Sequence, residues 1–191
     1  MYYKSDIYQL SIQMTLEKKI LKAFGWRAAF NVELPDKCVA CIAPHTSNWD
    51  FIFGILFKRA YKIQANFFIK QEWIKFPVGG IIKRLGGIAI HRNKQQSTTD
   101  VMAKEFENHK IMRIAITPEG TRRLNSDWKM GFYYIALKAS VPIVLISMDY
   151  QKKLVEVGKI IFPNGDAEIQ LAEIKDYFKN VTPRFPERFK V

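Results

Sequence analysis

The stretch that decides the fold is Cys38-Val-Ala-Cys-Ile-Ala-Pro-His-Thr-Ser-Asn-Trp-Asp-Phe-Ile-Phe-Gly-Ile-Leu-Phe57. Its first six residues are apolar, which is typical of a short buried strand, and residues 51–57 are apolar again, as in a helix or a second buried segment. The polar turn between them contains His45 and Asp50. Turns from a strand into a helix often present functional side chains. We therefore take this turn as the centre of a candidate site.

Outside this stretch, apolar runs and helical periodicities alternate along the chain. Strands are predicted at residues 66–70, 86–92, 113–117, 142–147 and 154–162. Helices are predicted at residues 5–25, 98–109, 128–140 and 166–180, with a helix or loop at 76–85 and an irregular tail at 182–191. This alternation predicts one α/β domain over residues 1–191, in which a mainly parallel central sheet is flanked by helices. We expect an amphipathic helical N-terminal segment over residues 1–30 and a catalytic α/β core over residues 31–191.

The chain is strongly basic. Among its 191 residues Lys and Arg number 30 and Asp and Glu 18, which gives a formal net charge of +12. Such an excess indicates an anionic partner, which is nucleic acid, an acidic lipid surface or a phosphorylated substrate. No apolar run approaches the length that crosses a bilayer, and no signal-peptide core follows Met1. We expect a cytoplasmic protein, peripheral on the inner face of the membrane, whose N-terminal helix docks either on its own core or on lipid headgroups.

His45 and Asp50 are the candidate catalytic pair. A neutral imidazole takes and returns a proton near pH 7, and a carboxylate at its other ring nitrogen fixes the tautomer and stabilises the imidazolium. On a regular helix, residues five apart do not share a face, so a turn has to bring the two side chains together. A second interpretation remains open, because Ser47-x-x-Asp50 also fits a capping box at the start of a helix.

Charged residues also follow other predicted strands. Arg92 ends one strand, and Glu119-Gly-Thr-Arg-Arg123 follows another. Because ligands of parallel α/β sheets bind at the carboxyl ends of the strands, we expect these residues to converge with His45 on one site. Arginine forks match phosphate oxygens, although these arginines are alternatively solvated or paired with Glu119 and Asp127. Glu119 itself is expected to orient Arg122 or to accept a hydrogen bond from the substrate.

The two cysteines and the glycines indicate no cofactor site. Cys38 and Cys41 are too few for a zinc site, which needs four ligands, and residues three apart in a strand point to opposite faces. We interpret them as buried apolar residues. The glycines of residues 79–87 match neither a P-loop nor a dinucleotide fingerprint, so no metal and no nucleotide cofactor is expected. Lys83 and Arg84, in the same segment, are interpreted as surface charges or headgroup contacts.

Four short blocks carry a family resemblance. They are His45–Asp50, Gly86–Arg92, Pro118–Arg122 and Val141–Ile143. In this order they resemble the H-x4-D block, the arginine-ending second block, the E-G-T-R block and the fourth block of the glycerophospholipid acyltransferases, typified by 1-acylglycerol-3-phosphate acyltransferase. The blocks span about half of the chain. H-x4-D alone is a weak motif, whereas the ordered set is specific.

The resemblance implies transfer of a fatty acyl group from a thioester of coenzyme A or acyl carrier protein to the hydroxyl of a lysophospholipid. His45 would deprotonate that hydroxyl and Asp50 would orient His45. The acceptor site would comprise Arg92, Glu119, Gly120, Thr121 and Arg122, with the two arginines near the phosphate. The implied partners are the acyl donor, the lysolipid and an anionic membrane surface, with no nucleic acid and no cofactor beyond the co-substrate.

Three positions depart from the family pattern. Pro44 stands where many members carry Asn, Ala89 where Phe is common and His91 where Asp is common. These changes touch the acceptor side of the site and leave the acceptor lipid open. Three rivals to the transferase also remain open, which are a thioesterase or lipid hydrolase on the same fold, a catalytically silent lipid-binding protein and a nucleic-acid-binding module.

Overall fold

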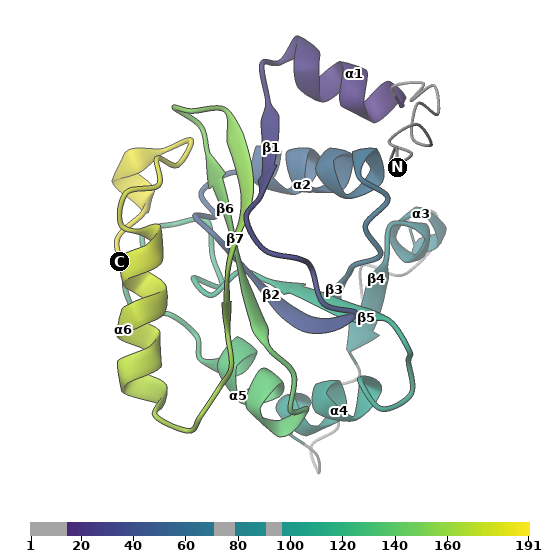
Figure 1. Cartoon of the computed structure of the whole chain (residues 1–191), viewed down its shortest axis with the longest axis vertical. Coiled ribbons are helices and arrows are strands. Elements are labelled where there is room, and N and C mark those ends of the chain that lie inside the picture. The colour runs from purple at the N-terminus through teal and green to yellow at the C-terminus, as the bar shows by residue number, and fades with distance from the viewer. Residues whose placement is uncertain (1–14, 71–78, 91–96) are drawn as a thin grey trace, which may run out of the picture.

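A seven-stranded sheet in the order β1-β7-β6-β2-β5-β3-β4 runs through the middle of the computed structural model, which describes residues 15–70, 79–90 and 97–191 (Figure 1). The strands are β1 Arg27–Phe30, β2 Lys37–Ala43, β3 Asn66–Lys70, β4 Gly87–Ile90, β5 Met112–Ile116, β6 Ile143–Asp149 and β7 Leu154–Ile161. Every pairing in this sheet is parallel except that of β6 with β7. The predicted α/β fold with a mainly parallel sheet is confirmed.

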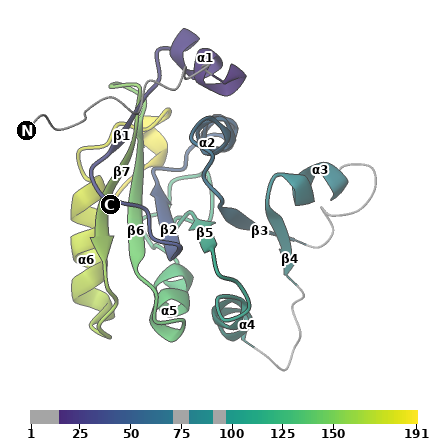
Figure 2. The same ribbon diagram turned by 45° about the vertical axis from the view of Figure 1, so that its right-hand side comes forward.

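Helices cover both faces of the sheet (Figures 1 and 2). They are α1 Leu16–Ala23, α2 Asn48–Ala60, α3 Gly79–Arg84, α4 Thr98–Glu105, α5 Gly131–Lys138 and α6 Ala167–Phe178. One buried cluster joins α1 and α2 to the sheet, and a larger cluster joins α4, α5 and α6 to its other face. The sheet is therefore buried on both sides, as parallel sheets generally are.

Strand β2 lies at the centre of the sheet, between β5 and β6. Cys38 belongs to the buried cluster on the α2 side and Cys41 to the cluster on the opposite side. Both are free thiols, and burial raises the pKa of Cys38 to about 12. The expectation that the two cysteines are buried and face opposite sides of the sheet is confirmed.

The N-terminal segment differs from the prediction. We expected a helix over residues 5–25 within a helical segment 1–30. Helix α1 ends at Ala23, close to that prediction, but Arg27–Phe30 forms strand β1, parallel to β7 at the edge of the sheet. Gly25, with φ of +78°, reverses the chain between them. The four residues of β1 are too few to show an alternating pattern, so only pairing with β7 reveals the strand. The part of the predicted helix before residue 15 lies outside the described residues.

Two other helices are shorter than predicted. Helix α4 ends at Glu105 instead of residue 109, and α5 begins at Gly131 instead of residue 128. Just before α5 the Lys129 N–H donates to the Pro118 carbonyl over 2.7 Å, which joins this segment to the turn after β5. The tail after Thr182 is irregular, as predicted, apart from one 3-10 turn at Pro186–Arg188.

None of the described helices combines the length and the apolar character that a membrane crossing requires.

Candidate active site

The predicted pair lies together at the carboxyl end of β2. His45 is in the four-residue turn that joins β2 to α2, directly after a cis peptide bond between Ala43 and Pro44, and Asp50 is in the first turn of the helix. His45 Nδ1 lies 3.3 Å from Asp50 Oδ2. The turn thus brings together two side chains that a continuous helix would keep on different faces.

Asp50 also caps helix α2. Its Oδ2 atom accepts hydrogen bonds of 2.8 Å from the backbone N–H groups of Thr46 and Ser47. Ser47 and Asp50 form a reciprocal capping box, as the alternative interpretation predicted. The two interpretations are compatible, because the carboxylate that caps the helix is the one that contacts His45. Capping holds it in a single orientation beside the ring.

The environment of Asp50 keeps its carboxylate ionised. Burial raises the pKa of Asp50, but hydrogen bonds from His45, Tyr150 and Ser47 outweigh burial, so the pKa lies below its ordinary value. A charged carboxylate at Nδ1 favours the tautomer with the proton on that nitrogen. The other ring nitrogen, Nε2, is then a proton acceptor. The His45 side chain is 21% exposed, so a bound molecule can reach it.

Glu119 holds His45 from the neighbouring strand. It follows β5, and its Oε1 atom accepts a hydrogen bond of 2.8 Å from the His45 backbone N–H. The residue is 2% exposed, and its Oε2 atom is buried without a partner among the described residues. Burial raises the pKa of Glu119, although backbone hydrogen bonds, including the one from His45, partly offset it. Glu119 therefore fixes the turn that carries His45, which the sequence did not predict.

The remaining predicted site residues are Gly120, Thr121, Arg122 and Arg92. Gly120, with φ of +64°, turns the chain after Glu119, and Thr121 Oγ1 accepts a hydrogen bond from the Arg123 N–H. Arg122 is exposed, and no hydrogen bond or ion pair joins it to Glu119 within the described chain, contrary to one of our expectations. Arg92 lies outside the described residues. The residues that follow β2 and β5 therefore converge on one site, as predicted.

Tyr150 also belongs to the site, although no sequence pattern predicted it there. Its hydroxyl donates a hydrogen bond of 2.5 Å to Asp50 Oδ1. Burial and the Asp50 carboxylate raise the pKa of Tyr150, so the hydroxyl stays protonated and acts as a donor. Tyr150 directly follows β6, so the rule that found Glu119 also applies to it. An aromatic residue after a buried strand is so often part of the core that the sequence did not distinguish it.

The C-terminal tail closes the other side of the turn. The Phe185 N–H donates to Thr46 Oγ1 over 3.3 Å, and the Tyr150 N–H donates to the Thr182 carbonyl over 2.8 Å. The Arg184 guanidinium lies over the rings of Trp49 and Tyr150, at 5.3 Å and 5.9 Å from their centroids. These contacts hold residues that follow β2 and β6 in one assembly.

Known proteins resemble this chain in sequence and in structure. Residues 30–149 match the family model of acyltransferases. Human 1-acyl-sn-glycerol-3-phosphate acyltransferase beta is 32% identical over 110 residues, which are 54% of this chain and 40% of that protein. The chain thus corresponds to well under two thirds of this relative.

The fold also has a counterpart among solved structures. The crystal structure of the 1-acyl-sn-glycerophosphate (LPA) acyltransferase PlsC from Thermotoga maritima superposes with a TM-score of 0.62. That alignment covers 85% of this chain and 73% of PlsC, at 17% sequence identity. The family model covers His45, Asp50, Glu119 and the strands that carry them. The chain belongs to the acyltransferase family, and its expected resemblance to the glycerophospholipid acyltransferases is confirmed.

Proposed function

We propose that the protein transfers a fatty acyl group from an acyl thioester to a hydroxyl of a lysophospholipid or a related glycerol-phosphate lipid, with His45 as general base. The observation that carries this proposal is the contact of His45 Nδ1 with the ionised, helix-capping carboxylate of Asp50. This contact leaves Nε2 as the proton acceptor on a partly exposed ring. Family membership and the named relatives support the same chemistry.

The reaction proceeds by direct transfer between two bound substrates. His45 Nε2 takes the proton of the acceptor hydroxyl as its oxygen attacks the thioester carbonyl carbon. The carbon–sulfur bond then breaks, and the thiolate takes the proton from the imidazolium. No acyl group is bonded to the protein at any stage. A positioned base contributes about 10²- to 10⁴-fold to the rate, and juxtaposition of the two substrates contributes further.

Asp50 and Glu119 act through His45. Asp50 stabilises the imidazolium that forms during the reaction, because its carboxylate is ionised and contacts Nδ1. Glu119 fixes the backbone of the turn, and its second carboxylate oxygen, which has no partner among the described residues, lies in the buried layer beneath it. Arg92 and Arg122 are assigned to the acceptor phosphate, with Gly120 and Thr121 shaping the turn beside it.

We place the protein peripherally on an anionic membrane surface, at the inner face of the membrane. Helix α1 docks on α2 through buried Leu21. Its first residue, Leu16, is 69% exposed, and Phe24, directly after the helix, is 55% exposed. Basic residues accompany these apolar ones, and the chain has a net charge of +12. Both properties favour attraction to anionic lipid.

An acyl-transfer assay with separated products tests the function. The protein is incubated with acyl-coenzyme A, or acyl carrier protein, and a panel of lysolipids, and diacyl lipid and free fatty acid are quantified separately. We expect the amount of diacyl lipid to rise in step with the amount of thiol released. Free fatty acid without diacyl lipid would identify a thioesterase instead. Absence of both products for every pair would support a lipid-binding role and contradict catalysis.

A further inference from the structure

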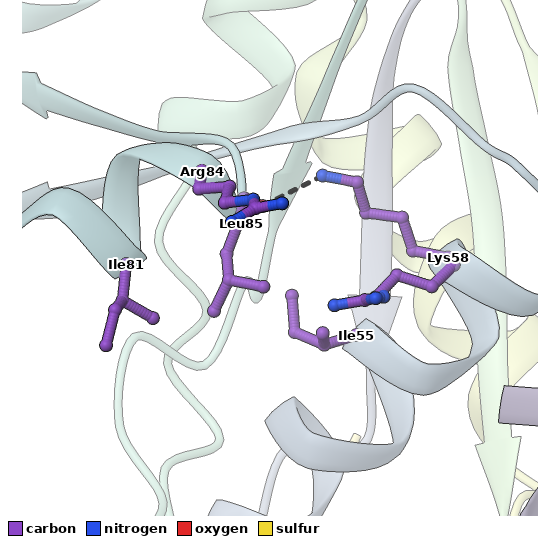
Figure 3. Close-up of a pocket in the computed structure, with 6 residues that line it drawn as sticks. Ile55, Lys58, Ile81, Arg84 and Leu85 are labelled. Carbon is purple, nitrogen blue, oxygen red and sulfur yellow. Dashed lines mark hydrogen bonds between the residues drawn. The ribbon is translucent and has the colours of Figure 1, made fainter. Parts of the chain in front are cut away.

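A cavity of about 480 Å³ lies between α2 and α3, away from the catalytic turn (Figure 3). Of the described residues that line it, half are aliphatic and half are cationic. The lining residues are Ile55, Ile81 and Leu85 together with Lys58, Arg59 and Arg84. Such a lining suits an amphiphilic molecule with a negatively charged end, because it offers apolar contact and cationic hydrogen-bond donors side by side.

Lys58 is the most informative of these residues. Its ammonium group donates to the Ala65 and Leu85 carbonyls, the latter over 2.8 Å, so it is held at the wall of the cavity (Figure 3). No carboxylate pairs with it among the described residues. Burial lowers the pKa of Lys58, as expected for a cation that lacks a counter-charge. An ammonium has three donors, and the third has no acceptor in the described part of the chain.

The neighbouring arginines add to the positive charge of the cavity. Arg59 is paired with Glu17 of α1 at 2.8 Å. Arg84, in the last turn of α3, has no such pair among the residues that the structure describes. Within the described part of the chain, Lys58 and Arg84 therefore lack a counter-charge, and they lie on opposite walls, an arrangement that suits a phosphate.

An apolar face of α2 connects this cavity with the catalytic turn. Phe51 and Ile52 precede Ile55 by four and three residues, so all three lie on one side of the helix. Phe51 and Ile52 are 46% and 44% exposed, and the ring of Phe51 meets that of Phe67 on β3 edge-on. From Asp50 to Lys58 the helix rises about 12 Å, at about 1.5 Å per residue.

We propose that this cavity binds the phosphate end of the acyl donor, with the phosphopantetheine arm lying along the apolar face of α2. The assignment rests on the proposed function, which supplies a thioester at His45. The arm joins sulfur to phosphorus through about a dozen bonds of the kind found in peptides, which span about 14 Å when extended. This length matches the rise from Asp50 to Lys58. Coenzyme A and acyl carrier protein share the arm, so the site serves either carrier.

Two substitutions test the site without disturbing the fold. Arg84→Gln removes one of the two cations on opposite walls, and Ile81→Glu places a carboxylate opposite the phosphate at a position that is 62% exposed. Lys179→Gln, at an exposed position directly after α6, is the control. Each protein is assayed with acyl-coenzyme A and with the acyl thioester of N-acetylcysteamine, which lacks phosphate. Melting curves verify that each variant is folded.

The proposal expects the KM for acyl-coenzyme A to rise about tenfold in Arg84→Gln, which corresponds to one charge-assisted hydrogen bond, and at least as much in Ile81→Glu. The kcat value, the KM for the lysolipid and the KM for the phosphate-free donor should stay within twofold of the wild type. Equal effects on both donors, or none on either, would overturn the assignment. The assignment would also be overturned if the variants lost binding to anionic vesicles while keeping the wild-type KM for acyl-coenzyme A. The cavity would then bind lipid headgroups.

Direct binding separates this inference from the proposed function. Titration calorimetry with coenzyme A and with pantetheine requires no turnover. Coenzyme A should bind more tightly than pantetheine, and Arg84→Gln should remove this difference. That result would support the site even if no lysolipid is acylated. Conversely, acyl transfer by a protein whose affinity for coenzyme A is unaffected by both substitutions would uphold the function and reject the site.

Discussion

The Tyr150 hydroxyl donates a hydrogen bond of 2.5 Å to Asp50 Oδ1, while Asp50 Oδ2 contacts His45. Both oxygens of the carboxylate are thus engaged, one by a donor that follows β6 and one by the imidazole that follows β2. Tyr150 itself is packed against Trp26, whose ring lies 5.0 Å away at nearly a right angle. The orientation of the proposed catalytic pair consequently depends on strand β6 as well as on its own turn.

Tyr150→Phe should lower kcat about tenfold and leave the KM values nearly unchanged, because one hydrogen bond to a charged group is lost while both substrate sites remain intact. Steady-state kinetics of the acyl-transfer reaction measures this split. Tyr134→Phe, on a ring that is 45% exposed, is the matched control and should behave as wild type. A Tyr150→Phe enzyme with full kcat would show that Tyr150 only packs.

His45→Ala should reduce kcat by about 10²- to 10⁴-fold, since the general base is removed. Asp50→Asn should cause a large but smaller loss, because the imidazole remains while its orientation and the stabilisation of the imidazolium are lost. Product formation per unit time is the measurement, and His109→Ala, at an exposed position four residues after the end of α4, is the control. Comparable activity in all of these proteins would contradict the proposed mechanism.

Ser47→Ala should lower the free energy of unfolding by about 1 kcal/mol, as expected for a lost serine N-cap, and should also lower kcat. Ser97→Ala removes the corresponding serine cap of α4, far from the pair in sequence, and should lower stability similarly while leaving kcat unchanged. Urea denaturation and kinetics on both variants measure the two effects. If both variants keep full kcat, the capping box does not position Asp50 for catalysis.

Glu119→Gln should change the pH dependence of stability. The pKa of Glu119 is raised in the folded state, so its favourable contribution is fully present below the ordinary value of 4.5 and is lost as pH rises through the raised pKa. Glutamine stays neutral and still offers an oxygen to the His45 N–H. The variant should therefore melt at the same temperature as wild type in acid and at a higher temperature at pH 8.

Thermal unfolding between pH 4 and pH 8 checks this difference, and Glu107→Gln at an exposed position is the control. A melting temperature of Glu119→Gln that falls below that of the wild type as pH rises would show that the ionised carboxylate stabilises the turn. Activity measured on the same samples separates the structural role of Glu119 in the turn from a role in contacting the substrate. Loss of kcat in a more stable variant would assign the unpartnered oxygen to the substrate.

Much of the fold was predictable because its main elements are encoded locally. Strand β2, the following turn and helix α2 show their apolar runs and cap within twenty residues of sequence. Strand β1 was not predictable, since four residues carry no periodicity and their partner, β7, lies more than a hundred residues further on. The end of α4 and the start of α5 were displaced because the apolar pattern does not show the turns at helix ends. After α4 the Phe106 and Glu107 N–H groups bond to carbonyls three residues back, and before α5 the Lys129 N–H bonds to Pro118.

The candidate site was predictable only in part, because some of its contacts join residues that are far apart in the sequence. The strand-end rule located His45, Asp50 and Glu119, and the structure brings these three together. It did not specify that Glu119 binds the backbone of His45 instead of orienting Arg122. That choice depends on the alignment of β5 beside β2, which pairs Cys41 with Ile116.

The sequence by itself determined the segment that carries the chemistry, because capping and turn formation involve residues within five positions of one another. His45, Ser47 and Asp50 were therefore found without a fold. Only the tertiary structure decided what surrounds them. The contacts of Asp50 with Tyr150 and of His45 with Glu119 join residues 100 and 74 positions apart. Such contacts follow from the order and register of the strands, which no local pattern encodes.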